Sequence, residues 1–157
     1  MEVKAIPDGY HSMTPYLIVE GGAKAITFYK QAFGATELLC MEMPDGEIGH
    51  AEIKIGNSII MLSGSSCGEI PVRDPKSLGG SSVGLHLYVE DVDALFSQAV
   101  LAGAKVVKPV EDKFYGDRSG TLEDPFGHFW FLSTHKEDLT PEELSKRADA
   151  LFKQGNP

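Results

Sequence analysis

The feature that most constrains this chain is an internal repeat. The runs Tyr16-Leu-Ile-Val-Glu20 and His86-Leu-Tyr-Val-Glu90 are both extended and β-rich, and each leads into an amphipathic helical stretch closed by Gly-Ala, at Gly34 and Gly103. Glycine at that position supplies the left-handed residue that ends a helix. The copies lie 70 residues apart at the strand and 69 at the glycine. The shared register predicts one supersecondary unit used twice.

Each copy continues into three strand candidates separated by turn residues such as Pro44-Asp45-Gly46 and Pro125-Phe126-Gly127. The candidates are Thr36–Met43, Ile48–Ile55 and Ser58–Ser63 in the first copy, and Lys105–Val110, Gly120–Glu123 and His128–Ser133 in the second.

The pattern therefore predicts an α+β chain of two βαβββ modules, residues 10–63 and 83–135. A Gly-, Ser- and Pro-rich linker, residues 64–82, joins the modules and is expected to have little structure of its own. It either covers the mouth of a pocket or simply tethers the two copies.

A helix is predicted at the C-terminus, over residues 140–154. Thr140 is its N-cap, Pro141 occupies the first helical position and Glu143 completes a capping box. The helix has an apolar face that must pack either on the domain or on a second subunit; its members are Leu144, Ala148, Leu151 and Phe152.

Charge and hydropathy exclude several classes of partner. The formal net charge of −9 opposes binding to nucleic acid or to an anionic membrane, because polyanions require a basic surface. No apolar run is long enough to span a bilayer, and the N-terminus lacks a basic-then-apolar signal pattern. We expect a cytoplasmic protein.

Strand residues alternate between two faces of a sheet. In both modules one face is uniformly aliphatic and is expected to pack against the helices, whereas the other is mixed. His50 and Glu52 lie on the mixed face of the first module, and His86 lies on that of the second. Such a face is typical of a small-molecule pocket, although a solvated outer face has the same composition.

These three residues are the candidate catalytic groups. Two histidines and a carboxylate are able to form a relocated metal site, or an acid–base pair in which Glu52 orients a histidine. The alternative is that they are polar residues without a chemical role. The candidate ligand-binding residues are Met61, His86, Tyr88, Tyr115, Arg118, Phe129 and Phe131.

Three further residues have competing interpretations. Asp117 and Arg118 either pair with each other or fix the loop; alternatively Arg118 meets an anionic ligand, since a guanidinium suits carboxylate and phosphate groups. Trp130 is predicted to pack beneath the C-terminal helix. His128, which follows the Pro125-Phe126-Gly127 turn, is expected to have a turn or packing role.

Several runs resemble a known superfamily. Pro15-Tyr-Leu-Ile-Val-Glu20, Ala25-Ile-Thr-Phe-Tyr29 and Asp124-Pro-Phe-Gly-His128 are similar to those of the vicinal oxygen chelate superfamily, which includes glyoxalases and bleomycin-resistance proteins. Tyr115-Gly-Asp-Arg118 and Thr134-His-Lys-Glu-Asp-Leu-Thr-Pro-Glu-Glu143 resemble its PhnB-like branch. The resemblance implies modules forming an open, cup-like mixed β-barrel, with a pocket on the concave side, usually at a homodimer.

The resemblance also implies four positions that hold a divalent cation in metal-using relatives. In this chain they fall on Thr14, Met61, Gly84 and Phe131. Glycine and phenylalanine offer no donor and a thioether is a soft ligand, so this set does not suit a hard or borderline cation. We therefore expect a small-molecule binding protein without the usual metal site and without a cofactor. The alternative is a lyase, isomerase or dioxygenase-type enzyme that uses a relocated His/Glu site, with or without a metal.

Overall fold

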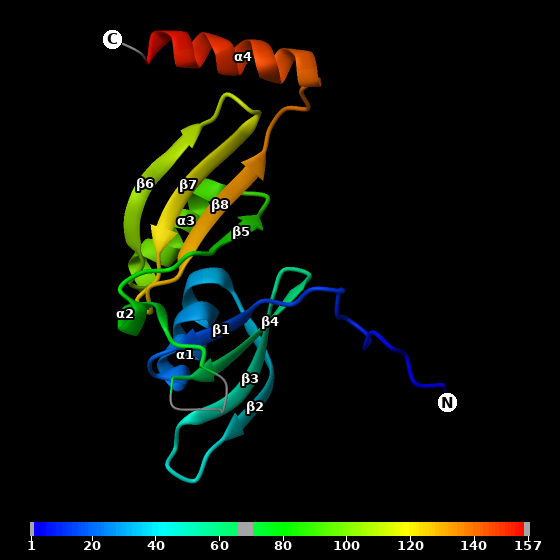
Figure 1. The fold of residues 1–157 in the computed structure, drawn as a ribbon, viewed down its shortest axis with the longest axis vertical. Helices are drawn as coiled ribbons and strands as arrows, with labels where there is room; N and C mark the ends of the chain where they lie inside the picture. The colour runs from blue at the N-terminus through cyan, green and yellow to red at the C-terminus, as the bar shows by residue number, and fades with distance from the viewer. Residues whose placement is uncertain (1, 66–70, 156–157) are drawn as a thin grey trace.

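The computed structural model describes residues 2–65 and 71–155 and contains two four-stranded sheets. The first module consists of β1 (Tyr16–Val19), α1 (Gly22–Phe33), β2 (Thr36–Glu42), β3 (Ile48–Ile55) and β4 (Ser58–Gly64). The second consists of β5 (Gly84–Tyr88), α3 (Val92–Ala102), β6 (Lys105–Asp112), β7 (Asp117–Glu123) and β8 (Phe129–His135). The predicted α+β class with two βαβββ modules is confirmed (Figure 1).

The two sheets have the same topology. The strand orders are β1-β4-β3-β2 and β5-β8-β7-β6, with the first and last strand of each module parallel. Tyr16 lies opposite Met61, and His86 lies opposite Phe131, so the offset of 70 residues survives in the strand register. Among the described residues no strand of one sheet pairs with a strand of the other, so the chain alone closes no barrel and leaves β1 and β5 as edge strands.

Several element boundaries differ from the predicted ones, most of all in the second module. β7 begins at Asp117 rather than Gly120, and β8 continues to His135, because the β7–β8 ladder extends to the Asp117–His135 pair. The linker was expected to have little structure, yet it contains the short helix α2 (Pro75–Leu78), whose N-cap Asp74 accepts a hydrogen bond from the backbone N–H of Ser77. Residues 66–70 of the linker lie outside the described part.

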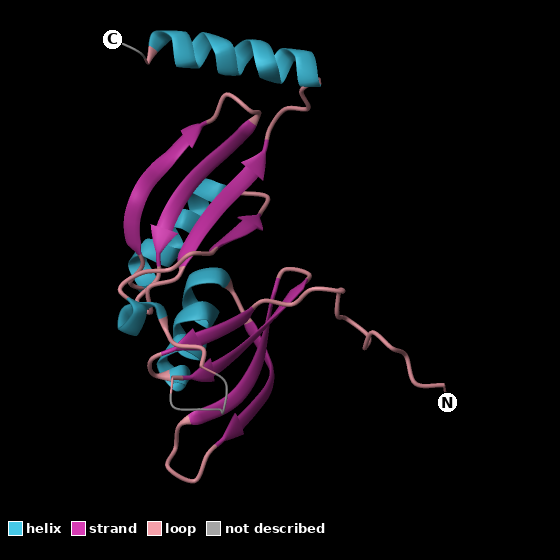
Figure 2. Ribbon diagram, viewed as in Figure 1, coloured by secondary structure: helices cyan, strands magenta, loops and turns pink. Residues whose placement is uncertain are grey.

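The hydrophobic core lies between the sheets and their helices. α1 and α3 each cover the aliphatic face of their own sheet and pack against each other where the modules meet (Figure 2). Trp130 contacts α1, with ring centroids 4.5 Å from Phe33 and 5.6 Å from Tyr29. The prediction that it packs beneath the C-terminal helix is therefore wrong. Alternation placed Trp130 on the correct face but could not identify the helix that covers it.

A buried carboxylate connects the two modules. Asp124 is 4% exposed and its Oδ2 accepts hydrogen bonds from the Tyr29 hydroxyl at 2.6 Å and from Trp130 Nε1 at 2.9 Å. Its Oδ1 accepts from the backbone N–H groups of Phe126 and His128. Burial, and then the nearby Asp124 carboxylate, raise the pKa of the Tyr29 hydroxyl well above its ordinary value.

His128 also joins the modules, because its Nε2 lies 2.9 Å from the carbonyl oxygen of Ile18 in β1. The imidazole is buried, so the predicted packing role of His128 is confirmed.

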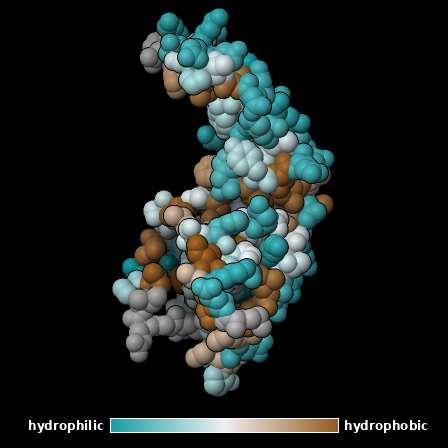
Figure 3. Space-filling model, turned by 90° about the vertical axis from the view of Figure 1, so that its right-hand side faces the viewer, coloured by the Kyte–Doolittle hydropathy of each residue, from teal (hydrophilic) through white to brown (hydrophobic). Residues whose placement is uncertain are grey.

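The C-terminal helix α4 (Pro141–Gln154) lies across the far end of the second sheet and has the predicted capping box. None of its residues is buried, and Leu151 and Phe152 are 47% and 67% exposed. Figure 3 shows apolar side chains along its underside. Arg147 attaches the helix through two bonds to the Glu137 carboxylate, at 2.8 and 2.7 Å. Within the described residues the apolar face of α4 is thus only partly covered, with Ala148 half-buried and Leu144, Leu151 and Phe152 exposed.

No helix among the described residues is long and apolar enough to cross a bilayer.

Candidate functional site

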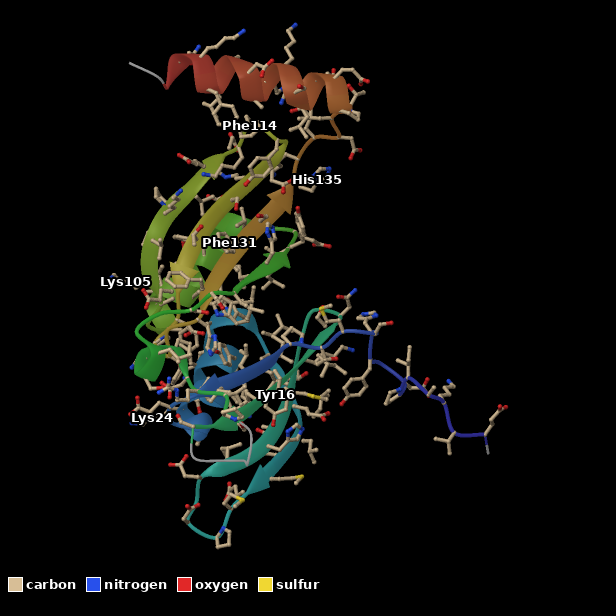
Figure 4. The ribbon with its side chains drawn as sticks, in the orientation of Figure 1. Tyr16, Lys24, Lys105, Phe114, Phe131 and His135 are labelled. Atoms are coloured by element: carbon tan, nitrogen blue, oxygen red, sulfur yellow. The ribbon has the colours of Figure 1, made fainter. Side chains whose placement is uncertain are left out.

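Three aromatic rings form a row on the mixed face of the second sheet. Phe131, His86 and Tyr88 come from β8 and β5, with Phe131 opposite His86 in the register. The centroids of His86 and Tyr88 are 4.7 Å apart with planes at 30°, and those of His86 and Phe131 are 6.2 Å apart with planes at 19°. Tyr88 is 59% and Phe131 39% exposed, so the row is open to a ligand. Figure 4 labels Phe131 on this sheet.

Gly84 leaves the space that the Phe131 ring occupies. A Cβ atom built on Gly84 would lie 2.2 Å from Cε2 and 2.9 Å from Cδ2 of the ring. Any side chain at position 84 would therefore displace Phe131. Gly84 and Phe131 stand at two of the four positions expected from the resemblance to hold a metal. Here the Phe131 ring packs directly over the Gly84 backbone.

A hydrogen-bonded chain extends from Tyr88 to the edge of the sheet. The Tyr88 hydroxyl donates to Asp117 Oδ2 at 2.8 Å, and Asp117 Oδ1 lies 2.7 Å from His135 Nδ1. His135 Nε2 lies 2.9 Å from Asp138 Oδ1. The bond to the Asp117 carboxylate raises the pKa of the Tyr88 hydroxyl. Hydrogen bonds to Asp117 and then Asp138 raise the pKa of His135, because both ring nitrogens must carry a proton to bond two carboxylates.

We expect His135 to make stability depend on pH. Its pKa is raised in the folded state, so its contribution is fully present below the ordinary value of 6.5 and is lost as the pH rises through the raised folded value. The melting temperature of His135→Gln should therefore fall below that of the wild type in mildly acidic buffer, and the difference should vanish in alkaline buffer. Differential scanning fluorimetry across this range measures it.

The matched control is His11→Gln, because His11 is an exposed residue of the N-terminal segment. A pH-independent difference for His135→Gln, or an equal pH-dependent difference for His11→Gln, would contradict the assignment to the Asp117–His135–Asp138 contacts.

Arg118 points away from the row. Its guanidinium pairs with Asp93 at the start of α3, at 2.7 and 2.9 Å, and with Asp112 at 3.1 Å. The predicted pairing with Asp117 is wrong, since both Asp117 oxygens bond Tyr88 and His135. The two carboxylates raise the pKa of Arg118 further.

The mixed face of the first module has a different hydrogen-bonded chain. The Tyr10 hydroxyl donates to the Glu52 carboxylate, whose other oxygen lies 3.2 Å from His50 Nε2. The Tyr16 hydroxyl lies 2.9 Å from His50 Nδ1. The hydrogen bond from Tyr10 holds the pKa of Glu52 below its ordinary value and raises that of Tyr10. Beside it, a cavity of about 420 Å³ is lined by Met61, Glu52 and the N-terminal segment.

The candidate residues thus form two groups rather than one. His50 and Glu52 are in contact on the first sheet, while His86 contacts Tyr88 and Phe131 on the second. Within residues 2–65 and 71–155, no group of three or more His, Cys, Asp or Glu side chains is placed to hold a metal ion. The hypothesis of a metal site built from His50, Glu52 and His86 of one chain is therefore wrong.

The remaining candidates lie around these groups. Phe129 is half-buried beside Gly84 in the register. Tyr115 is in the β6–β7 turn, packed edge-on against Phe114 and 38% exposed. Thr14 precedes β1 and is half-buried.

Sequence reasoning missed the roles of Tyr10, Asp117 and His135. Tyr10 precedes all regular structure, and its contact with Glu52 spans 42 residues, so local pattern carries no signal for it. Asp117 and His135 lie outside the predicted strands Gly120–Glu123 and His128–Ser133, but Asp117 begins β7, His135 ends β8, and the two pair across the ladder. Extending both strands would have placed them opposite each other.

Fold and site together define a protein of paired βαβββ modules whose mixed sheet faces carry exposed aromatic and polar side chains. The chain belongs to the Glyoxalase/Bleomycin resistance protein/Dioxygenase superfamily, whose family model matches residues 11–132. An uncharacterized protein of Mycobacterium tuberculosis is 40% identical over 148 residues, covering 92% of this chain and 85% of the relative.

Solved structures agree with this assignment. The crystal structure of TioX from Micromonospora sp. ML1 has a TM-score of 0.63 at 27% identity, covering 80% of this chain and 98% of TioX. A PhnB protein from Bacillus cereus shares the fold, with a TM-score of 0.61 at 19% identity over 79% of this chain and 99% of that one.

Proposed function

We propose that this protein binds a small organic molecule on the mixed faces of its sheets without using the divalent-metal ligand set of its superfamily. The packing of the Phe131 ring over Gly84 is the observation that carries the proposal. It replaces two ligand positions by an exposed aromatic surface, and Thr14 and Met61 stand at the other two. A surface of rings with a few polar groups is typical of sites that bind organic ligands.

A second candidate is acid–base catalysis at the first module. The Tyr10–Glu52–His50–Tyr16 chain supports it, because Glu52 is held as a carboxylate, lines the cavity and orients the His50 imidazole. Since Glu52 bonds Nε2 and the Tyr16 hydroxyl bonds Nδ1, a proton from a bound substrate would reach the imidazole through the Tyr16 hydroxyl. Loss of turnover in His50→Gln, with ligand binding retained, would distinguish catalysis from binding alone.

We propose that a second copy of this chain packs on the exposed edges of β1 and β5 and on the apolar face of α4. β1 and β5 have open edges among the described strands, and unpaired edges are usually covered in native assemblies. The apolar face of α4 is only partly covered within the described chain. A two-fold symmetric dimer covers the same surfaces on both copies at once, so one interface accounts for both features.

Metal analysis and thermal shift together test the proposed function. After dialysis, purified protein should retain far less than stoichiometric zinc, nickel, manganese or iron, and adding these metals should not raise the melting temperature. Organic molecules that bind the native state should raise it. Stoichiometric retained metal, with a shift abolished by a chelator, would contradict the metal-independent proposal.

A further inference from the structure

The row Phe131–His86–Tyr88 has a shape that selects flat ligands. Successive ring planes differ by only 19° and 30°, and the rings come from fixed positions of one parallel strand pair. The rings are stacked on one another with His86 in the middle, so the faces left for a ligand are the outer faces of Tyr88 and Phe131, where another planar π system would form an offset stack. The row is also held in place, because Gly84 seats Phe131 and Asp117 anchors the Tyr88 hydroxyl.

The charges around the row favour a cation. The Tyr88 hydroxyl donates a hydrogen bond to the Asp117 carboxylate. This bond increases the electron density of the ring face that a cation would meet. Asp117, His135 and Asp138 together keep a net negative charge even when the imidazole is protonated.

The basic groups nearby do not reverse this preference. Arg118 is engaged by Asp93 and Asp112 on the other face. Lys108 lies two strands away from Phe131 on the same face, and it interacts electrostatically with Glu111. β5 and β8 carry no lysine or arginine, and Lys105 and Lys108 both lie two strands away on β6, so no lysine or arginine stands directly beside the rings.

We propose that the ligand of this site is a planar aromatic cation that stacks on an outer ring of the row, Tyr88 or Phe131. This inference rests on the proposed function and narrows it to one chemical class. The parallel rings favour a flat ligand over a non-planar one, and the Asp117 carboxylate bonded to Tyr88 favours a cation over an anion.

Two fluorescent probes with the same three-ring plan and opposite charge test the proposal: proflavine, a cation, and anthracenecarboxylate, an anion. Fluorescence anisotropy titrations should give proflavine a Kd at least about tenfold lower. Cyclohexylammonium, a non-planar cation, should not compete. His86→Ala and Tyr88→Leu should each raise the Kd of proflavine by about five- to tenfold.

Tyr88→Phe distinguishes the preference for flat ligands from the preference for cations, because it keeps the aromatic ring and removes the hydrogen bond to Asp117. It should leave the binding of anthracenecarboxylate unchanged while reducing the preference for proflavine. Leu101→Ala is the matched control, since Leu101 is an exposed apolar residue on α3, away from the row. Unchanged melting temperatures would show that the variants remain folded.

Equal or tighter binding of anthracenecarboxylate, or binding of proflavine that ignores both row variants, would overturn the inference. So would the failure of both planar probes to bind below millimolar concentration. If non-planar organic molecules still raised the melting temperature, the proposed function would stand without this ligand class. If no organic molecule did so, the proposed function would fail as well.

Discussion

Asp124→Ala should lower the free energy of unfolding by about 3 to 5 kcal/mol, because it removes a buried acceptor and leaves several buried donors without a partner. Those donors are the Tyr29 hydroxyl, Trp130 Nε1 and two backbone N–H groups. Tyr29 belongs to α1 of the first module and Trp130 to β8 of the second. The change should therefore weaken the contact between modules as well as the local turn.

Urea denaturation measures this effect with two signals. Trp130 is the single tryptophan and reports the junction, while far-UV circular dichroism reports both sheets. Asp124→Asn should lower the free energy of unfolding by less than Asp124→Ala, since the amide keeps one acceptor oxygen. The matched control Asp8→Ala removes an exposed carboxylate paired with Lys4 and should stay within about 0.5 kcal/mol of the wild type. A loss below about 1 kcal/mol for Asp124→Ala would mean that the donors find other partners.

The double variant Leu151→Asp/Phe152→Asp should convert a dimer into a monomer, raising the dimer Kd by about a hundredfold or more. Both side chains are exposed on the underside of α4, where we propose that the second copy packs. Two carboxylates placed at an apolar contact would have to lose their water without gaining a counter-charge. Sedimentation velocity over a range of protein concentrations measures the change.

The control for this experiment places two aspartates on the opposite face of α4, as Lys146→Asp/Ala150→Asp. Lys146 and Ala150 lie with Glu142 and Asp149 on the polar side, and both are exposed. The control should remain dimeric. A wild-type protein that sediments as a monomer at high concentration would refute the dimer, and dissociation of the control would attribute the effect to helix charge alone.

Much of the fold could be predicted because its signals are local. Gly34 has the left-handed φ of 66° that the Gly-Ala ending predicted, and Thr140 and Glu143 form the expected capping box. Strand alternation correctly placed His50 and Glu52 together on one face. α2 also had a local signal, an Asp-Pro pair at the N-cap and first helical position, which the Gly- and Ser-rich composition of the linker obscured.

The contacts that sequence reasoning could not predict are long-range. Trp130 meets α1 about a hundred residues earlier in the chain, and Arg118 meets Asp93 rather than its neighbour Asp117. Periodicity gives the face on which a side chain lies, but the partner on that face depends on how whole elements pack. Both chains of hydrogen bonds at the candidate site depend on such packing, so the sequence could supply their members only in part.

The contact between Gly84 and Phe131 has a consequence for how this site is able to evolve. A histidine introduced at position 84 would need the volume that the Phe131 ring fills, and a metal ligand introduced at 131 would still face a glycine. Neither single substitution rebuilds a pair of donors, and the first also displaces the ring. The route from an aromatic surface to a metal chelate therefore passes through an intermediate that has neither, so a chelate at these two positions requires both substitutions together.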